Sequence, residues 1–473
     1  MNGMEAMAEN PLDLLPELFL LLGAVGGLLL GLWTPQNRQS RVRAVTVVAA
    51  LASAVAATVD LAGPDLVVFD GTWVIDTTTG VVRITVALGT AAAVLLASSS
   101  LSGHPRETEA YVLMLLGALG SIALAASGDL LMLVAGYLLA SVPLYALAGF
   151  AKDARGVEAT LKYYLMGAFV GVLMLVGVAA LILAGDSSGY VDLAAALPQA
   201  PRPVVAVGVL GVLAGVAFKA GAVPVHFWVP DVTAGTSPSI AAYLTTIPKL
   251  GAVAAAFRLL AEPFADVPLD VPLIVAVIAA ASMTLGNLAA FQQTEVLRLL
   301  AYSTVSQVGY LFMVVAVAAR TDLAVPALSV YLAGYAVTNI GAFAAAAALP
   351  GASTISDWAA EVTRRPLLVL SLVVVLLGLV GTPPTVVFVG KLAVFAAAFD
   401  GGLGWLVVLA AVNTVASLFY YLRWIAPAAT AAADPAQPRR AVARAPAATA
   451  HAAAAGSLAL GAGAGLWLAF VTG

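Results

Sequence analysis

The chain has 473 residues, of which 62% are hydrophobic and only 10% are charged, and its formal net charge is −4. A soluble domain is about 25% charged, so this composition excludes a soluble enzyme. The chain has no cysteine, which excludes disulfides, thiol nucleophiles and iron–sulfur ligation, and its histidines at 104, 226 and 451 are scattered, so the sequence predicts no metal site.

Apolar runs of about 20 residues, the length that crosses the hydrocarbon core of a bilayer, recur along the whole chain. They predict an all-α polytopic membrane protein with about 14 transmembrane helices. The first run counts as a true span, because the residues before it carry acids and no base, unlike a cleavable signal. In chain order the helices are expected at 12–33, 42–62, 82–101, 109–127, 129–150, 158–184, 203–225, 238–260, 268–290, 296–318, 323–348, 366–399, 404–424 and 453–471.

Two of these spans carry internal breaks. GAVP at 221–224 interrupts the seventh span and GTPP at 381–384 interrupts the twelfth. Gly and Pro free backbone groups that lipid cannot satisfy, so such breaks are tolerated only inside the protein or beside a wet cavity. Broken helices in corresponding halves are typical of transporters built from inverted repeats. We therefore expect two inverted five-helix repeats with breaks in helices 7 and 12.

The predicted divisions of the chain follow from these spans. They are an N-terminal three-helix segment at 1–108, the first repeat (helices 4–8) at 109–260, the second repeat (helices 9–13) at 261–425, a cytoplasmic loop rich in Ala, Pro and Arg at 426–452, and helix 14 at 453–473.

The basic residues sort by loop and predict the orientation. Most fall in alternate loops, whereas the opposite loops hold only Arg202, Arg320 and, at a helix edge, Arg83. Cytoplasmic loops are enriched in Lys and Arg, so both termini are predicted to face outward. A composition rich in Ala, Val, Gly and Arg favours a GC-rich bacterial source, and hence a multi-pass protein of the bacterial plasma (inner) membrane.

Other side chains near the ends of the spans have simpler interpretations. Trp33 and Trp228 are expected to anchor the chain at the membrane interface. Arg258, late in the eighth span, is expected to extend outward or to pair with Glu262.

Lysine is rare in this chain, yet three of the five lysines lie inside predicted spans. They are Lys219, before the first break, Lys391, after the second, and Lys249, which follows Pro248. Arg keeps its charge in proteins, whereas a desolvated Lys can release its proton. We interpret the three as proton-transfer groups; the alternative is that they reach an interface or pair statically with a carboxylate.

Six stretches carry a resemblance to known proteins: GYLLASVPLYALAGF (136–150), GVEATLKYYLMGAF (156–169), GVAFKAGAVPVHFWVPDVTAGTSPS (215–239), VLRLLAYSTVSQVGYLFM (296–313), YAVTNIGAF (335–343) and GTPPTVVFVGKLAVF (381–395). In order over about residues 12–425, the chain resembles the antiporter-like membrane subunits of respiratory complex I, most closely subunit N of NADH–quinone oxidoreductase. The resemblance implies a translocase subunit that moves protons and carries no redox centre or cofactor. Its implied partners are other membrane subunits of a complex I type assembly and the lipid bilayer, with no nucleic acid.

The resemblance also implies roles for the lysines. Lysines that match Lys219, Lys249 and Lys391 form a hydrated axis through the middle of the membrane in that family. The first exchanges its proton and its pairing with a glutamate of the fifth helix, the second passes the proton along the axis, and the third lies on the exit side. Candidate residues of the proton path are His226, at the cytoplasmic entrance, Ser303, Ser306 and Tyr310, beside Lys249, and Gln307. The alternatives are a hydrogen bond that anchors the loop for His226 and helix packing for Ser303, Ser306 and Tyr310.

The chain departs from the family at two of these positions. Leu138 stands where the fifth-helix motif has its glutamate, and Gln307 stands where many relatives have a histidine. No nearby carboxylate replaces the glutamate: Asp129 lies nine residues back, about 13 Å along a helix, and Glu158 is expected to pair with Lys162 one turn on.

Several hypotheses follow from the missing glutamate. In the first, the chain still pumps, with Lys219 paired to an anion from another helix or subunit, or switched by field and hydration alone. In the second, it is a diverged structural subunit that no longer pumps. In the third, it belongs to an Mrp-type cation/proton antiporter, although Na⁺ prefers oxygen ligands and the axis is poor in acids. A fourth possibility is an exporter of lipid or another substrate, but the sequence predicts no charged pocket, beyond the lysines, that would support it.

Overall fold

The structure is a computed structural model that describes residues 10–359, 361–430 and 441–472. Almost all of the described chain is helical, and in it twelve helical segments are long and apolar enough to cross a membrane. The all-α polytopic fold is therefore confirmed. The total of fourteen spans, the inverted repeats and the divisions of the chain stay predictions.

The N-terminal part begins with a short 3-10 helix, η1 (Pro11–Leu14), and contains three long helices and one hairpin. The helices are α1 (Leu15–Trp33), α2 (Ser40–Leu61) and α3 (Thr77–Leu101), with η2 (Gln36–Arg38) between the first two. Between α2 and α3, strand β1 (Leu66–Val68) pairs antiparallel with β2 (Trp73–Ile75), with Val67 opposite Val74. The apolar periodicity of the spans did not predict this hairpin.

The remaining elements follow in chain order. Up to the middle of the chain they are α4 (Glu107–Ala126), α5 (Leu130–Leu139), α6 (Val142–Ala148), α7 (Ala154–Gly185), α8 (Tyr190–Ala196), η3 (Leu197–Gln199), α9 (Arg202–Ala220), α10 (Trp228–Gly235) and α11 (Pro238–Ala261). After it come α12 (Val271–Phe291), α13 (Val296–Val315), α14 (Ala324–Ala348), η4 (Ile355–Trp358), α15 (Glu361–Arg364), α16 (Pro366–Val380), α17 (Val386–Asp400), α18 (Gly404–Thr430) and α19 (Arg444–Thr472).

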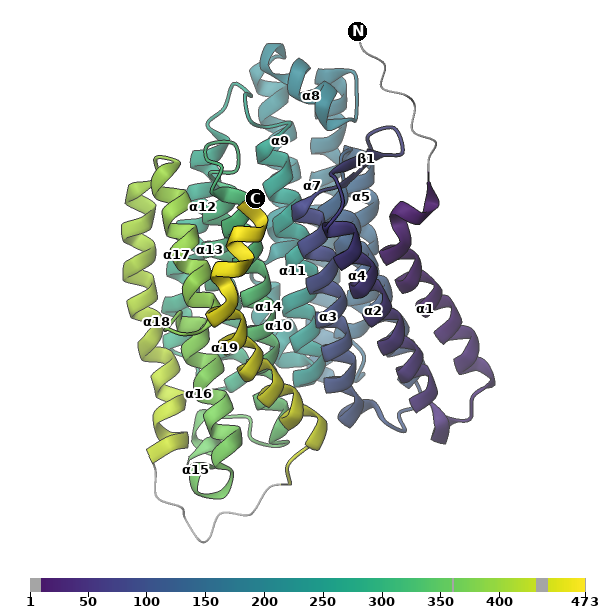
Figure 1. Cartoon of the computed structure of the whole chain (residues 1–473), viewed down its shortest axis with the longest axis vertical. Coiled ribbons are helices and arrows are strands. Elements are labelled where there is room, and N and C mark those ends of the chain that lie inside the picture. The colour runs from purple at the N-terminus through teal and green to yellow at the C-terminus, as the bar shows by residue number, and fades with distance from the viewer. Residues whose placement is uncertain (1–9, 360, 431–440, 473) are drawn as a thin grey trace.

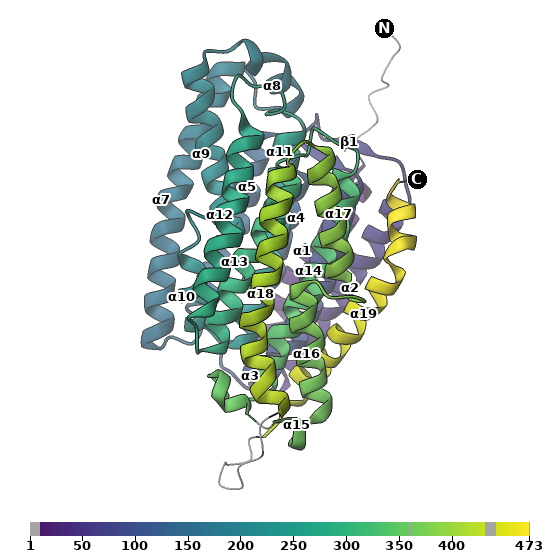
Figure 2. The same ribbon diagram turned by 90° about the vertical axis from the view of Figure 1, so that its left-hand side faces the viewer.

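The long helices run roughly along the long axis of the molecule, with α1 and α2 at one side and α17 and α18 at the other (Figure 1). Helix α11 lies between these groups and packs against α3, α4, α9, α13 and α14. The apolar stretch of α11 is completely buried inside the chain. Figure 2 shows α7 and α9 side by side at the left-hand edge of the bundle. Helix α11 is therefore the core of the bundle.

Helices α7 and α9 approach each other through glycines. A Cβ added at Gly177 of α7 would lie 2.7 Å from the carbonyl oxygen of Gly208 and 2.9 Å from the Cα of Gly211, both on α9. Small residues of this kind let membrane helices approach until their backbones touch. The pair is thus packed backbone against backbone.

Both predicted helix breaks are present. Helix α9 ends at Ala220, where Gly221 adopts a left-handed φ of 76°, and α10 starts at Trp228. Helix α16 ends at Val380, where Gly381 has φ 89°, and α17 starts at Val386. Glycine adopts this backbone conformation without the steric cost that a Cβ imposes.

A third break, which the sequence analysis missed, divides the predicted span 129–150 into α5 and α6. Pro143 has no N–H, and the N–H of Leu144 donates to the carbonyl of Ser141 at 3.0 Å instead of continuing the α-helical pattern. The carbonyl of Ala140 is thereby left for a donor from outside the helix.

The expected loop at 426–452 is shorter than predicted. Helix α18 continues to Thr430 and α19 already starts at Arg444, so both ends of the expected loop are helical. Alanine has the highest helix propensity of all residues, and both ends are rich in it. Residues 431–440, the middle of the expected loop, lie outside the described residues.

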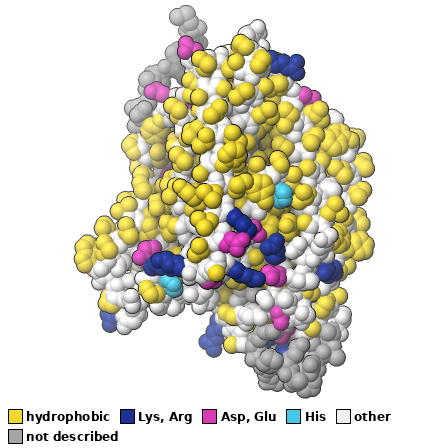
Figure 3. All heavy atoms as spheres, turned by 180° about the vertical axis from the view of Figure 1, so that it is seen from behind, with side chains coloured by type: hydrophobic (Ala, Val, Ile, Leu, Met, Phe, Trp, Pro, Cys, Tyr) yellow, Lys and Arg dark blue, Asp and Glu magenta, His cyan; other side chains and the backbone are white. Residues whose placement is uncertain are grey.

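Most charged side chains lie in the loops and near the helix ends, apart from the three lysines inside the spans. The hairpin and α8 lie at the upper end in Figure 1, and α15 lies at the lower end. Seen from behind, most of the surface is hydrophobic, and charged side chains collect in a band toward its lower part (Figure 3). This separation is what the charge pattern predicts; which end faces the cytoplasm stays a prediction.

Arg258 has a different partner from the one expected. Its guanidinium forms a two-pronged ion pair with Asp76, at 3.0 Å to each oxygen, and also donates to Thr79 and to the carbonyl of Ala125. Asp76 is at the same time the N-cap of α3. Burial raises the pKa of the Asp76 carboxyl, but the charge and hydrogen bonds of Arg258 outweigh burial and hold that pKa below its usual range. The pair ties the end of α11 to the start of α3.

Replacement of Asp76 by Asn should destabilise the protein by about 2–4 kcal/mol, because it leaves the Arg258 guanidinium buried and unpaired. Thermal unfolding in detergent at neutral pH measures the loss, with exposed Asp266→Asn as the control. The folded pKa is below the unfolded one, so the stabilisation is present above about pH 4 and is lost as the pH falls further. Equal melting temperatures for the two variants at pH 7 would contradict this.

Candidate functional site

Lys219 lies in the last turn of α9 and is completely buried. Its ammonium donates to the carbonyl of Ala140 at 3.0 Å and to the hydroxyl of Ser141 at 2.5 Å. Both acceptors lie at the break between α5 and α6, where Pro143 interrupts the helical hydrogen bonding. The break that the sequence analysis missed therefore supplies the partners of the first lysine.

Three tyrosine rings surround the same ammonium. Its nitrogen lies 5.0 Å from the ring centre of Tyr137 and 6.0 Å from those of Tyr145 and Tyr163. Trp228 stacks on Tyr163, with ring centres 4.3 Å apart, and its indole N–H donates to the carbonyl of Phe218. The prediction that Trp228 is an interface anchor is therefore wrong, whereas Trp33 is 79% exposed at the end of α1.

No carboxylate pairs with Lys219 in the part of the chain that the structure describes. Leu138, at the position of the family glutamate, is 50% exposed on the outside of α5. Asp129 caps α5 through the N–H groups of Leu131 and Met132. The hydrogen-bond acceptors of the Lys219 ammonium in the described chain are therefore uncharged.

Lys249 lies in the middle of α11 and is completely buried. Its ammonium donates to the hydroxyl of Thr304 on α13 at 3.0 Å. It also lies against the break in α9, because a Cβ added at Gly221 would be 3.2 Å from its nitrogen. The middle lysine therefore touches the end of the helix that carries Lys219.

Lys391 lies on α17, just beyond the second break, and is 3% exposed. Its ammonium donates to the carbonyl of Val380 at 2.9 Å and, more weakly, to that of Leu379 at 3.5 Å. Its nitrogen lies 3.9 Å from the ring centre of Tyr310. Lys391 thus takes the carbonyls that the end of α16 leaves free.

Gln307 connects the second and third lysines. Its amide donates at 2.8 Å to the carbonyl of Leu379, which Lys391 also approaches, and its oxygen accepts from Tyr331. Thr304 precedes it by three residues, one turn of the same helix, and holds Lys249. One face of α13 therefore leads from Lys249 to Lys391.

The other candidate path residues lie around this face. The Ser303 hydroxyl bonds with Tyr421, and the Tyr310 hydroxyl bonds with Thr414. The Ser306 hydroxyl is buried and has no hydrogen-bond partner in the structure. Thus Tyr310 lies beside Lys391 rather than beside Lys249, and Thr304, which the sequence analysis did not single out, takes the place foreseen for Ser303 and Ser306.

His226 lies in the segment between α9 and α10, half-buried, with its Nδ1 atom buried and without a hydrogen-bond partner. Asp231 of α10 forms ion pairs with Lys162 at 2.9 Å and with Arg298 at 3.3 Å. Lys162 also pairs with Glu158 at 2.9 Å, as expected. These charges line a cavity of about 180 Å³ at the lower end.

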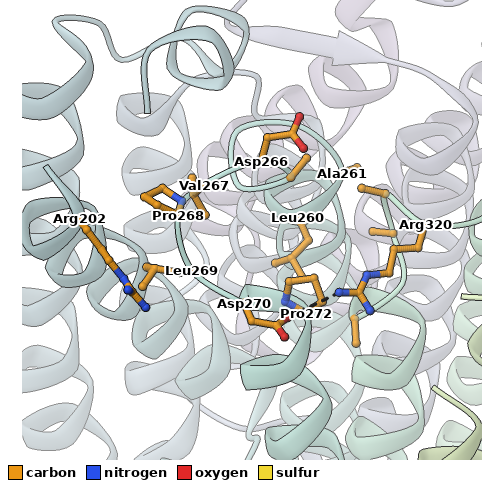
Figure 4. A pocket seen from close by; sticks show the side chains of 14 residues that line it. Arg202, Leu260, Ala261, Asp266, Val267, Pro268, Leu269, Asp270, Pro272 and Arg320 are labelled. Carbon is orange, nitrogen blue, oxygen red and sulfur yellow. Dashed lines mark ion pairs between the residues drawn. The ribbon is translucent and has the colours of Figure 1, made fainter. Parts of the chain in front are cut away.

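A larger cavity, of about 800 Å³, lies at the upper end of the bundle and is shown in Figure 4. Its charged lining residues are Arg202, Asp266, Asp270 and Arg320, and Arg320 pairs with Asp270 at 3.6 Å. None of the three buried lysines lines it. The lysine axis is a packed polar path within the bundle and is separate from this surface pocket.

Three buried lysines, two of them beside helix breaks and all of them bonded to uncharged groups, are what we expect of an antiporter-like membrane subunit, and comparison with known proteins agrees. The family model described as NADH:quinone oxidoreductase/Mrp antiporter, TM matches residues 127–417. The chain is 53% identical to NADH-quinone oxidoreductase subunit N 1 of Streptomyces griseus over 467 residues, 97% of each protein. The chain therefore belongs to the family of NADH-quinone oxidoreductase subunit N.

Two solved structures show the same fold. The first is a chain of respiratory complex I from Thermus thermophilus with bound aureothin, at a TM-score of 0.83, 30% identity and coverage of 97% of this chain and 100% of that chain. The second is a chain of the Mrp complex from Dietzia sp., at a TM-score of 0.81, 22% identity and coverage of 98% and 97%. The second likeness concerns the fold alone.

Replacement of Gly221 by Ala tests the contact between the first break and Lys249. Ala at φ 76° is strained, and its Cβ would lie 2.7 Å from Val229 and 3.2 Å from the Lys249 nitrogen. Gly402→Ala is the matched control, because Gly402 has φ 82° but no atom within 4 Å of the added Cβ. Overpacking costs about 1–3 kcal/mol, so Gly221→Ala should lower the melting temperature in detergent more than Gly402→Ala does. Equal losses would show that only backbone strain matters at Gly221.

Proposed function

We propose that the chain is a subunit N type membrane subunit of a complex I type NADH-quinone oxidoreductase, and that it translocates protons along Lys219, Lys249 and Lys391. The observation that carries the proposal is that all three ammonium groups are buried and hydrogen-bonded to neutral oxygens. Ionisable side chains inside membrane helices are rare and commonly mark proton or ion pathways, and none of these three pairs with an acid in the described chain.

When the hydrogen-bond partner of a buried lysine is neutral, no paired anion fixes the lysine in its protonated form. Water is scarce at these positions, so the charged form of lysine is costly, and a nearby charge acts on it strongly. Carbonyl and hydroxyl oxygens accept hydrogen bonds from the ammonium but do not hold it as a carboxylate would. A change in the local field or hydration, driven by another subunit, is then enough to make each lysine take up or release a proton.

The order of groups suggests the route. We infer that protons enter through the charged cavity around Asp231 and that His226, in the segment between α9 and α10, relays them toward Lys219. Lys249 touches Gly221 two residues beyond Lys219, and Thr304 and Gln307 lead from it along α13 to Lys391. Gln307 does not titrate at neutral pH, so its role is to orient water or the Leu379 carbonyl.

The remaining parts of the function belong to the assembly. Redox chemistry in other subunits drives the transfer, and this chain carries no cofactor of its own. Other membrane subunits of the complex and the lipid bilayer are its partners. The protein lies in the bacterial plasma membrane with its Arg-rich lower end in the cytoplasm and both termini on the outer face, following the positive-inside rule.

An Mrp-type cation/proton antiporter is the second candidate, because a chain of the Mrp complex from Dietzia sp. has the same fold. The axis offers Na⁺ no carboxylate ligand among the described ion pairs and hydrogen bonds of the three lysines. The 53% identity to a subunit N, against 22% to the Mrp chain, favours the first assignment.

Lys219→Ala should abolish proton transfer through this chain while the complex still assembles, because alanine cannot carry a proton. The measurement is the number of protons taken up by inverted membrane vesicles per NADH oxidised, with assembly checked by co-purification of the other subunits. The control is Lys152→Ala, at an exposed lysine in the loop between α6 and α7.

An unchanged proton ratio in the Lys219→Ala variant, with the complex assembled, would favour the structural subunit that does not pump. Proton movement that depends on Na⁺ and not on NADH would favour the Mrp-type antiporter. Purification of the tagged chain without any complex I subunit would contradict the assembly itself.

Thr304→Val should slow proton transfer about tenfold without loss of assembly, because a hydrogen bond to a charged group contributes about 1.5–3 kcal/mol. Valine keeps the shape of threonine and removes only the hydroxyl that Lys249 uses. The matched control is Thr46→Val in α2, a buried threonine whose hydroxyl bonds only within its own helix. The same vesicle assay applies, and equal rates for both variants would exclude Thr304 from the path.

A further inference from the structure

The surroundings of Lys219 contain a feature that the proposed proton path does not by itself require. The ammonium has three N–H donors, and the structure gives two oxygen acceptors, from Ala140 and Ser141. Three aromatic rings also lie within 6.0 Å of it: Tyr137 from α5, Tyr145 from α6 and Tyr163 from α7. Rings from three separate helices converge on one buried cation.

We propose that Tyr137, Tyr145 and Tyr163 form an aromatic receptor for protonated Lys219, in which the ring faces supply the negative potential that a carboxylate would otherwise provide. The proposal rests on the proposed function and deepens it. The face of an aromatic ring is electron-rich, and a cation within about 6 Å of its centre is attracted, most strongly where water is excluded.

The rings are held in place by their own contacts, as a receptor requires. Tyr163 is stacked on Trp228, and Tyr145 meets Tyr163 edge to face, with ring centres 4.8 Å apart at 85°. Gly167 makes room for the Tyr145 hydroxyl, because an added Cβ would lie 2.1 Å from that oxygen. The Tyr137 hydroxyl reaches the carbonyl of Gly167 at 3.4 Å. None of these contacts involves Lys219, so they hold the rings in place whether or not the lysine is charged.

The same combination recurs at the second helix break. Lys391 donates to the carbonyl of Val380 and lies 3.9 Å above the ring of Tyr310. Lys249, which follows no such break, has a hydroxyl partner instead. Freed carbonyl plus aromatic face thus occurs at both lysines beside broken helices, at positions 172 residues apart by the numbering of the chain.

An aromatic receptor suits a lysine that must lose its proton again. When a paired lysine becomes neutral, its carboxylate is left as a buried, unpaired charge, which is costly. When Lys219 becomes neutral, the tyrosine rings and the Ala140 carbonyl are also neutral, and no buried charge remains. The receptor favours the charged form moderately and allows the neutral form, so both states are accessible.

Few other titratable groups face this site. Helix α7 contributes Tyr163 and, behind Tyr145, Tyr164; α5 and α6 contribute Tyr137 and Tyr145. Helix α11 contributes Lys249, which touches Gly221, and the segment from α9 to α10 contributes His226 and Asp231, the latter already paired with Lys162 and Arg298. The pH response of translocation is therefore to be read with Lys249 and His226 intact.

The test replaces Tyr137 by phenylalanine and by phenylalanines with one, two and three ring fluorines, introduced at that position in the assembled complex. Fluorine withdraws electrons from the ring face and changes its volume little, so it separates electrostatic attraction from packing. The readout is the pH dependence of protons moved per NADH oxidised. The matched control is the same series at Tyr164, which is 52% exposed and has no contact with Lys219 among the cation–ring contacts of the structure.

Tyr137→Phe is the reference for the fluorine series, because it keeps the ring and removes only the hydroxyl. Each added fluorine should move the alkaline midpoint of translocation to lower pH, by about one pH unit over the series. The series at Tyr164 should show no such trend. A midpoint that does not move with fluorination at Tyr137, in a complex where Lys219→Ala abolishes transfer, would overturn the receptor and leave the proposed function standing. If Lys219→Ala itself has no effect, both are overturned.

Discussion

The structure depends on one constraint: inside a membrane, every backbone carbonyl released from a helix needs a donor from the protein, because lipid offers none. Among the described residues, the breaks inside predicted spans release carbonyls at three places, where Pro143, Gly221 and Gly381 interrupt or end helices. At two of them a lysine ammonium is the donor, through Ala140 and Val380. The carbonyls of Ala140 and Val380 thus fix where the ammonium groups of Lys219 and Lys391 lie.

This constraint also explains which parts of the molecule could be predicted from sequence. The breaks near Gly221 and Gly381 carry paired Gly and Pro signals, so they and the lysines beside them were foreseen. The break before Pro143 was missed because one proline in an apolar run also fits a continuous, kinked helix. Most predicted spans have boundaries within a few residues of the helices, although α3 already begins at Thr77 and the alanine-rich ends of the α18–α19 connection continue as helix.

The partners of the side chains were less predictable than the side chains themselves. Ser303 and Thr304 are neighbours on α13, and adjacent positions of a helix point about 100° apart. The sequence marks this polar stretch but not which hydroxyl meets Lys249. Arg258 and Asp76 are far apart in sequence, so no local pattern joins them. Trp228 was assigned to the interface by residue type alone, and only the fold shows it stacked on Tyr163.

The glycine contact between α7 and α9 has a mechanical consequence. The backbones of α7 and α9 are in contact at Gly177, Gly208 and Gly211, with no side chains between them. We therefore expect the two helices to move as one rigid unit, a strut at the edge of the bundle. Lys219 and Tyr163 are carried by the two members of that strut, so the distance between them is insulated from motions elsewhere. The other elements around Lys219 are the short helices α5, α6 and α10, which begin or end at helix breaks, where backbone groups lack partners within the helix.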